Sequence, residues 1–358
     1  MKYLNKFKTG QLIVFLLIGL LNISCKQQAV TIQGSALGTT FNIALYPNAS
    51  VSIDELQEKV QAILKESDRY FSTYRDDSEI SRFNQHKSNQ PFEVSQDLYN
   101  LVKTSLSYAV ITEGGLDITT HSLSLLWGFG PNKKIEFNAP EQGEIEKVLG
   151  YTGYWNITVL NKNNKYYLQK KNENTQIDLS AVAKGNVVDV ISEMLEESGV
   201  VSYMVELGGE IRIGQPIPGD SREAKNKLWT IGIERPDNKD RAVQNTVLLQ
   251  SISVATSGDY RNFNVEKNKK GSKKYTHILD ARSGRPVANK IRSVTVLAEK
   301  CKLADAMATE IFVMGKKKGI RYIQRKKLAA YIIYEEDNKM QEYTSAEFAK
   351  ITGQSLEN

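Results

Sequence analysis

Histidine and cysteine are scarce in this sequence, which has three histidines and two cysteines in 358 residues. Because zinc sites are built mainly from these two residue types, a His/Cys zinc site is not expected. The sequence also lacks a G-x-S-x-G elbow, a Walker A loop and an H-E-x-x-H motif. Gly128-Phe129-Gly130 lacks the third glycine of a dinucleotide-binding fingerprint. The chemistry must therefore come from other groups.

Long apolar runs are lacking as well. The run at residues 12–21 is about 10 residues long, well short of the ~20 needed to span a bilayer. It follows three lysines and precedes Ser24-Cys25, which predicts a lipoprotein signal peptide over residues 1–24, although Asn22 stands where the usual motif has leucine. We expect residues 25–33 to be a lipidated cysteine, Cys25, and a polar tether. The rest would be exported, lipid-anchored to a bacterial membrane and facing the periplasm; the alternative is an uncleaved anchor helix.

Disulfides and a strong net charge are the remaining absences. With Cys25 lipidated, Cys301 is the only thiol left, so the exported chain must be held together by its core. A hydrophobic content of 41% suffices for a chain of this length. The formal charge of +6 falls to +3 without the three lysines of the signal peptide, which argues against a nucleic-acid partner.

Helical and strand-like patterns follow one another along the chain without a linker rich in proline or serine. Helices are predicted from Ser52, where Glu55 completes a capping box, and then over residues 95–113, 180–198, 302–314 and from 344 onward. Strands are predicted at 200–205, 229–233, 248–254 and 329–334, with a hairpin at 336–339. The mixed order indicates an α+β fold rather than a doubly wound sheet, with residues 34–358 as one large catalytic domain.

Asp305 and Thr309 lie four residues apart on a predicted helix, and therefore on one face of it. A carboxylate and a hydroxyl are oxygen ligands of the kind that Mg²⁺ prefers when phosphates and water complete its shell. Alanines at 304, 306 and 308 leave room for a bulky ligand. The alternative is an Asp favoured by the helix dipole and a Thr in the core.

The segment from Asp178 to Gly185 resembles an anion site. Asp178 is predicted to end a strand and Ser180 to be the N-cap of the next helix, whose free N–H groups favour anions, with Lys184 over the same end. An ordinary capped helix with a solvated Lys184 is the alternative.

Three further polar segments are candidates for a ligand cleft. Gly208 and Gly209 follow a strand, where a side chain would obstruct a ligand, or they simply form a hairpin turn. Residues 256–260 and 277–280 are predicted as loops beside a basic hairpin-like insertion. His277 could take a proton from a hydroxyl nucleophile, although a lone histidine is often structural.

Taken together and in order, these segments resemble the ApbE family of FAD:protein FMN transferases, over residues 34–315. The matching motifs are Ser72-Thr73-Tyr74-Arg75, residues 78–84, Gly115-Leu116-Asp117-Ile118-Thr119, residues 126–130, 178–185, 208–210, 255–260, 277–280 and 304–309.

The resemblance implies a two-lobed, T-fold-like catalytic domain with mixed or antiparallel sheets and packed helices. It also implies a Mg²⁺-dependent enzyme that cleaves FAD, moves FMN onto a Ser or Thr hydroxyl of another protein through a phosphoester bond, and releases AMP. By similarity, the metal ligands would be the Ala181 carbonyl, Asp305 and Thr309.

The same resemblance implies the flavin contacts. Lys184 would contact FAD, Tyr74 would pack against a ring of it, and Asp117 would bind it through polar contacts. The cleft would also be lined by further residues: Gly209, Gly258, His277, Ile278 and, where the family usually has Met, Leu37. His277 or Asp259 would activate the acceptor hydroxyl.

The family's usual acceptors belong to membrane-bound redox complexes, which suits a lipid-anchored enzyme. Two other functions stay open at this point. One is an FAD pyrophosphatase that uses water in place of a protein hydroxyl, and the other is a non-catalytic flavin-binding lipoprotein.

Overall fold

The computed structural model describes residues 29–131, 137–219, 227–236, 242–260, 262–268 and 271–353. The predicted signal peptide and Cys25 lie outside the described residues. Residues 30–33, predicted to belong to a tether, form the start of the first strand instead. Within the described ranges, no helix combines the length and the hydropathy needed to cross a membrane.

The centre of the molecule is an eight-stranded sheet in which the described neighbours all pair antiparallel. This confirms the α+β prediction and excludes a doubly wound parallel sheet. In spatial order the strands are β1 (Val30–Ala36), β2 (Thr39–Leu45), β6 (Tyr203–Leu207), β7 (Glu210–Ile213), β10 (Ile252–Gly258), β15 (Ile291–Ala298), β16 (Ala329–Glu336) and β17 (Lys339–Thr344).

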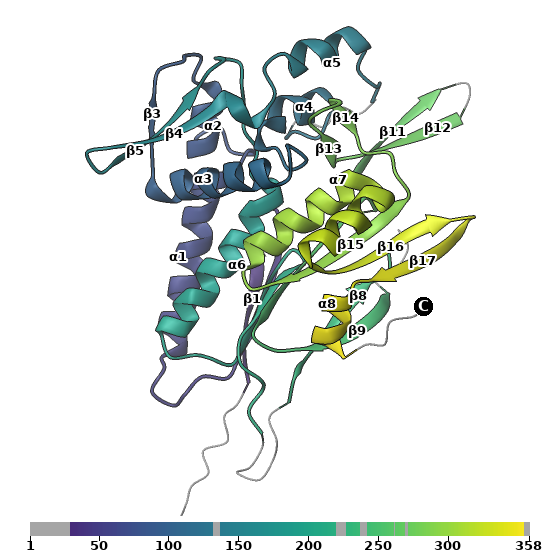
Figure 1. The fold of residues 1–358 in the computed structure, drawn as a ribbon. Helices are drawn as coiled ribbons and strands as arrows, with labels where there is room; N and C mark the ends of the chain where they lie inside the picture. The colour runs from purple at the N-terminus through teal and green to yellow at the C-terminus, as the bar shows by residue number, and fades with distance from the viewer. Residues whose placement is uncertain are drawn as a thin grey trace, which may run out of the picture.

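Helices cover one face of this sheet (Figure 1). α1 (Ile53–Phe71), α6 (Ser180–Glu197) and α7 (Cys301–Lys326) contact the strands directly, and α3 (Gln96–Ile111) packs on α1 and α6. Ser52 is the N-cap of α1 as predicted, accepting a hydrogen bond from Glu55 N at 3.3 Å. The prediction for α7 was too short, because a second helical segment follows the kink at Gly315, where φ is 72°.

The other face of the sheet is covered by a hairpin and a short helix, namely β8 (Trp229–Glu234), β9 (Val243–Leu249) and α8 (Ala346–Thr352). Alternate strand residues serve the two faces: Tyr331 packs under α8, whereas Ile332 packs under the helices. The predicted strand over 248–254 was wrong, because Ser251 has a φ of 47° and separates β9 from β10. The N-cap of α8 is Ser345, one residue after the predicted start.

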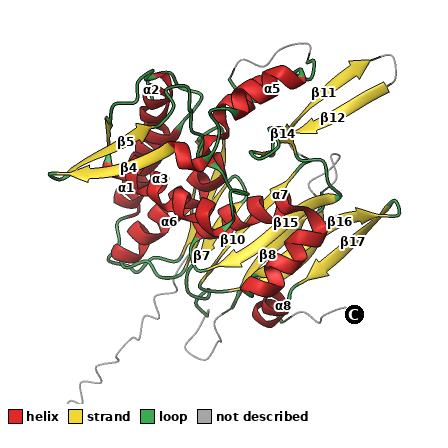
Figure 2. Ribbon diagram, turned by 45° about the horizontal axis from the view of Figure 1, so that its top comes forward, coloured by secondary structure: helices red, strands yellow, loops and turns green. Residues whose placement is uncertain are grey.

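The remaining elements do not belong to the central sheet (Figure 2). They comprise α2 (Glu79–Gln85), β3 (Phe92–Val94), η1 (Ile118–Thr120), α4 (His121–Leu126), α5 (Gln142–Leu149), η2 (Tyr154–Asn156), β4 (Ile157–Lys162), β5 (Lys165–Lys170), β11 (Phe263–Asn268), β12 (Gly271–Thr276), β13 (Leu279–Asp280) and β14 (Arg285–Pro286). The β11–β12 hairpin is the basic insertion expected before His277. The segment after it returns to the start of α7, where the candidate site lies.

Candidate active site

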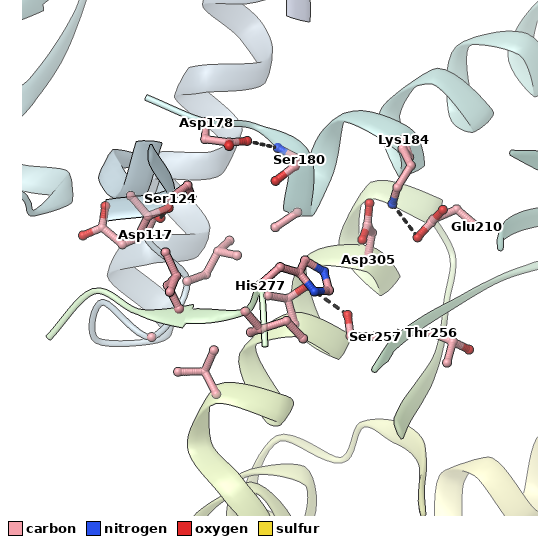
Figure 3. A pocket seen from close by; sticks show the side chains of 18 residues that line it. Asp117, Ser124, Asp178, Ser180, Lys184, Glu210, Thr256, Ser257, His277 and Asp305 are labelled. Atoms are coloured by element: carbon pink, nitrogen blue, oxygen red, sulfur yellow. Dashed lines mark hydrogen bonds and ion pairs between the residues drawn. The ribbon is translucent and has the colours of Figure 1, made fainter. Parts of the chain in front are cut away.

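A pocket forms where remote segments of the chain meet around the first turns of α6 and α7 (Figure 3). This cavity is called the active pocket below. It is lined by Gly115, Leu116, Asp117, Thr120, Ser124, Asp178, Ser180, Ala181, Lys184, Glu210, Thr256, Ser257, His277, Ile278, Leu279, Asp305, Thr309 and Val313. Seven of the residues predicted to bind metal or flavin or to act in catalysis are among them: Asp117, Ala181, Lys184, His277, Ile278, Asp305 and Thr309.

Close packing of α6 against α7 places the predicted metal ligands. A Cβ atom at Gly185 would lie 2.6 Å from the Cys301 carbonyl oxygen, so only glycine allows this approach. Gly185 N then donates to Asp305 Oδ2 at 3.2 Å. Further along α6, Asp189 accepts from the Cys301 and Lys302 amides at 2.9 and 3.1 Å and fixes the start of α7. Asp305 is therefore held against the first turn of α6.

The start of α6 differs from the prediction. Asp178 lies in an irregular segment rather than a strand, and its amide donates to the Ile118 carbonyl oxygen at 2.7 Å. The N-cap is Leu179, not Ser180, and Asp178 Oδ1 accepts from Ser180 N at 2.8 Å. Burial raises the pKa of Asp178, but the neighbouring His121 and Ser180 outweigh it, so this pKa lies below its ordinary value. Asp178 thus faces the pocket as a carboxylate.

Lys184 is engaged in a partly buried ion pair that the sequence alone does not reveal. Its Nζ lies 2.7 Å from Glu210 Oε1, and Glu210 is the first residue of β7. Burial lowers the pKa of Lys184, but the carboxylates of Asp305 and Glu210 raise it above its ordinary value. Lys184 is therefore a cation that lines the pocket and is paired with Glu210, although 31% of its side chain is exposed. Figure 3 shows this pair beside Asp305.

Asp305 is as deeply buried as Glu210, since both residues are 3% exposed. Burial raises its pKa, Lys184 lowers it, and Glu210 raises it further, with a value above the ordinary range as the result. A carboxylate in this position becomes more favourable when a second cation lies beside it. Thr309, with its hydroxyl group, and Ala181, with its backbone carbonyl, line the same pocket and offer further oxygen donors.

These oxygen donors fit a hard divalent cation such as Mg²⁺, which is commonly bound by one or two carboxylates together with water and phosphate. The described part of the chain contains no group of three His, Cys, Asp or Glu side chains that could hold a metal ion. A site made only of such side chains is thus excluded there, and substrate oxygens would have to complete the shell.

Gly208 and Gly209 form the turn between β6 and β7, as the hairpin alternative predicted. Gly208 has a φ of 64°, and a Cβ atom there would lie 2.9 Å from Thr39 Cγ2. Gly209 does not line the active pocket, but the turn brings Glu210 to Lys184. The functional residue of this motif is therefore the acid that follows the glycines.

Residues 256–258 were predicted as a loop, but they form the end of β10. Their strand geometry points Ser257 towards α7, where its Oγ lies 3.0 Å from Thr309 Oγ1. Gly258 lies outside the pocket, and a Cβ atom there would be 2.4 Å from the Tyr260 ring. Ser257 is a site residue that the sequence prediction missed, although it lies within a motif that had been noted.

His277 is the better placed of the two candidate bases. Its Nδ1 lies 2.9 Å from the Asn262 carbonyl oxygen, so Nδ1 carries the proton and Nε2 is left as an acceptor. Burial lowers the pKa of His277, which keeps the ring neutral near pH 7. Asp259, in contrast, does not line the pocket, and its Oδ2 is paired with Arg292 Nη1 at 3.0 Å.

The remaining predicted flavin contacts either have protein partners already or lie outside the pocket lining. Asp117 lines it, but one of its oxygens accepts from Thr119 N and Oγ1 and the other accepts from Tyr154 N. Tyr74 is 65% exposed and does not line the pocket. Leu37 lies in the β1–β2 turn with a φ of 51°, also outside the lining. A ligand larger than the pocket would be needed to reach Tyr74 or Leu37.

Comparisons with known proteins agree on one family. Residues 37–332 match the model of the "ApbE family". The chain is 36% identical to the FAD:protein FMN transferase of Vibrio cholerae, over 92% of this chain and 95% of that protein. It is 33% identical to the FAD:protein FMN transferase of Haemophilus influenzae, over 98% of this chain and 99% of that protein.

Solved structures give the same result. The flavin transferase ApbE from Vibrio cholerae superposes with a TM-score of 0.78 at 36% identity, covering 90% of this chain and 99% of that one. The ApbE protein of Thermotoga maritima superposes with a TM-score of 0.78 at 30% identity, covering 91% and 99%. The similarity includes all segments that form the active pocket.

Proposed function

Because the chain belongs to the ApbE family, we propose that its active pocket binds the diphosphate of FAD with Mg²⁺ and transfers FMN to a hydroxyl group of a protein. The activity itself is that of an FAD:protein FMN transferase, with FAD as substrate and a protein as acceptor. The metal, the acceptor hydroxyl and the phosphoester bond are the parts that we propose.

One observation carries the proposal: the first turn of α6, Lys184, Asp305 and Thr309 surround the same small cavity. The amides of Ser180, Val182 and Ala183 at the start of α6 already donate to Asp178 and to the Leu179 carbonyl. The group that favours a diphosphate here is therefore the Lys184 ammonium, held 2.7 Å from Glu210. The oxygen donors of α7 favour a cation next to it. A diphosphate and a divalent cation would each complete the other's coordination here.

The Ala181 carbonyl, Asp305 and Thr309 would hold the cation. When bound, Mg²⁺ withdraws electron density from the diphosphate and makes the flavin-side phosphorus open to attack. Lys184 would neutralise charge on the same oxygens, and Glu210 would keep its ammonium group in position. Ser257, 3.0 Å from the Thr309 hydroxyl, would orient that ligand.

The acceptor hydroxyl would enter beside His277. Nε2 of the neutral ring would take the proton while the hydroxyl oxygen forms a bond to the flavin-side phosphorus. The bond from that phosphorus to the bridging oxygen breaks, and AMP leaves with the bridging oxygen. A Ser or Thr side chain would thereby acquire FMN through a phosphoester.

Localisation and partners belong to the same proposal. The pattern of residues 1–25 supports a lipid anchor on Cys25 and a catalytic domain facing the periplasm. Acceptors would then be proteins of membrane-bound redox complexes whose hydroxyl groups face the same compartment. An anchored enzyme and an anchored acceptor meet at high effective concentration.

The test is to incubate the purified enzyme with FAD and Mg²⁺, with and without proteins from the native membrane, and to follow flavin by mass spectrometry. The proposal predicts FMN covalently attached to a Ser or Thr residue, together with stoichiometric AMP. FMN released only in free form would indicate the pyrophosphatase instead. No turnover with a genuine acceptor would indicate a flavin-binding protein without catalytic activity.

A further inference from the structure

A second cavity of about 640 Å³ lies along the far half of α7. Four of its lining residues are cationic, namely Arg282, Lys318, Arg321 and Arg325, and this cavity is called the basic pocket below. Ile111 and Met314 add apolar surface to it. None of the residues implied in flavin transfer lines it.

The kink in α7 creates the cationic face. After Gly315, with a φ of 72°, the helix continues in a new direction. Lys318, Arg321 and Arg325 are spaced by three and four residues and therefore lie on one side of this segment. The Arg325 guanidinium lies 5.6 Å from the Tyr322 ring centroid, which limits its movement.

In the ranges that the structure describes, Lys318, Arg321 and Arg325 form no ion pair, although nearby Lys316 pairs with Glu336 at 2.9 Å. Arg282 is the exception, with its Nε 2.8 Å from Asp280 Oδ1. Glu113 is the single acid in the lining of the basic pocket. The positive charge of the basic pocket is thus available to an anionic partner.

The basic pocket adjoins the active pocket along the chain. Val313 lines the active pocket and Met314 the basic one; likewise Gly115 lines the active pocket and Glu113 the basic one. The buried Glu310 side chain is close to residues of both pockets. A Cβ atom at Gly115 would be 2.1 Å from its oxygens, and its pKa responds to the charges of Arg282 and Glu113. A polypeptide that inserts a hydroxyl into the active pocket must also cover surface around it, and the basic pocket is a cationic part of that surface.

We propose that the basic pocket binds an acidic segment of the acceptor protein, close in sequence to the residue that receives FMN. Carboxylates would pair with Lys318, Arg321 and Arg325, and apolar side chains between them would contact Met314 and Ile111, which is 51% exposed. This inference rests on the proposed function, because it assigns the protein substrate to a surface beside that site. It makes the basic pocket a determinant of acceptor affinity, separate from the chemistry on FAD.

The experiment compares two double variants that change the charge equally on the same helix. Lys318→Glu with Arg321→Glu alters the basic pocket, and Lys317→Glu with Lys326→Glu alters exposed lysines outside its lining. The probes are two fluorescent synthetic peptides with one threonine, flanked in one by aspartate and leucine and in the other by asparagine and leucine. Binding is measured by fluorescence anisotropy, and FMN transfer to a native acceptor is measured as separate KM values for acceptor and FAD.

We expect the acidic peptide to bind the wild type, with a dissociation constant that rises about tenfold in the basic-pocket variant and stays unchanged in the control. The acceptor KM should rise in parallel, while the FAD KM and the melting temperature stay unchanged. Raising the salt concentration should weaken binding to the wild type and have little effect on the variant.

Equal binding of the two peptides, or equal losses in the two double variants, would overturn the inference. Displacement of the acidic peptide by AMP at lower concentrations than by unlabelled peptide would overturn it in favour of a phosphorylated small molecule. Absence of FMN transfer by the wild type would count against the proposed function, whereas the peptide measurements would still decide the inference.

Discussion

The two pockets along α7 handle charge in opposite ways. In the active pocket the cation and two hydroxyl groups have partners within the protein: Lys184 pairs with Glu210 at 2.7 Å, and Ser257 lies 3.0 Å from Thr309. In the basic pocket Lys318 and Arg321 are exposed, and among the described residues they form no ion pair.

This difference follows from burial. A buried charge without a partner is expensive, so a site that holds a small charged group out of water needs its own charges fixed beforehand. An exposed lysine or arginine stays hydrated at little cost and can wait for an anion from another molecule. Pairing therefore indicates a reaction site in the active pocket, and unpaired cations indicate a docking surface in the basic one.

The largest expected effect is a loss of FMN transfer, and it should distinguish two buried aspartates, Asp305 on α7 and Asp189 on α6. Asp305→Ala should lower FMN transfer roughly a thousandfold or more, because a metal ligand is lost, and leave the melting temperature nearly unchanged. Asp189→Ala is the matched control, since Asp189 anchors the start of α7 and pairs with Arg212 at 3.1 Å without lining the active pocket. It should destabilise the protein by about 3 kcal/mol while folded molecules stay active.

Rates in saturating FAD and Mg²⁺, together with thermal unfolding, distinguish the two roles. Undiminished transfer by the Asp305 variant would contradict the metal site. Loss of folding in both variants would mean that Asp305 is structural.

The second effect concerns the proton acceptor. Burial holds the pKa of His277 below its ordinary value, and the neutral ring is the active form. Transfer should therefore be independent of pH near neutrality and fall only in acid, as His277 becomes protonated. His277→Asn should remove this acid limb and lower the rate about a hundredfold, with the KM for FAD unchanged. If the His277→Asn variant still loses activity in acid, the titrating group is not His277, and Asp178 is the next candidate.

The third effect tests the helix contact beneath the active pocket. Gly185→Ala should destabilise the protein by about 1–3 kcal/mol and reduce transfer, because its Cβ atom would lie 2.6 Å from the Cys301 carbonyl oxygen and push α7 outward. Gly143→Ala in α5 is the control, since a Cβ atom there meets nothing within 4 Å. Equal stability of the two variants in chemical denaturation would rule out a tight α6–α7 contact.

The smallest effect concerns Glu310, whose two carboxylate oxygens are buried and have no hydrogen-bond partner in the described structure. Burial raises its pKa from 4.5 to about 8. A raised folded-state pKa means that the contribution to stability is fully present below pH 4.5 and is lost as the pH rises through about 8.

Metal-free wild type should therefore lose stability between pH 5 and pH 9, on the order of 2 kcal/mol more than Glu310→Gln. Urea unfolding across this range, with a chelator present, measures it. Parallel pH profiles for the two proteins would show that Glu310 is solvated or paired in solution.

Local patterns in the sequence predicted the elements that carry the active pocket, and non-local contacts explain what was missed. The spacing of Asp305 and Thr309 sufficed to place them on one helix face. The partner of Lys184 could not be predicted, because Glu210 reaches it only through the pairing of β6 and β7. The wrong strand at 248–254 has a similar cause, since one residue in a left-handed conformation, Ser251, divides an otherwise continuous apolar pattern.

The start of α6 illustrates a further limit. Ser180 has the side chain of a typical N-cap, but the carboxylate of Asp178 accepts the hydrogen bond from Ser180 N instead. Asp178 is held in place for this because its own amide donates to the carbonyl oxygen of Ile118 in η1. The basic pocket was not predicted at all. Its helix was expected to end at residue 314, and the lysines beyond it have no periodic apolar face that indicates a helix.

The most direct test of the central claim is anomalous diffraction from crystals soaked with FAD and Mn²⁺, an oxygen-loving substitute for Mg²⁺. The proposal predicts an anomalous peak between the first turn of α6 and α7, bonded to Asp305, Thr309 and the Ala181 carbonyl and in contact with the diphosphate. A fully occupied FAD diphosphate in the active pocket with no peak beside it would contradict the proposal.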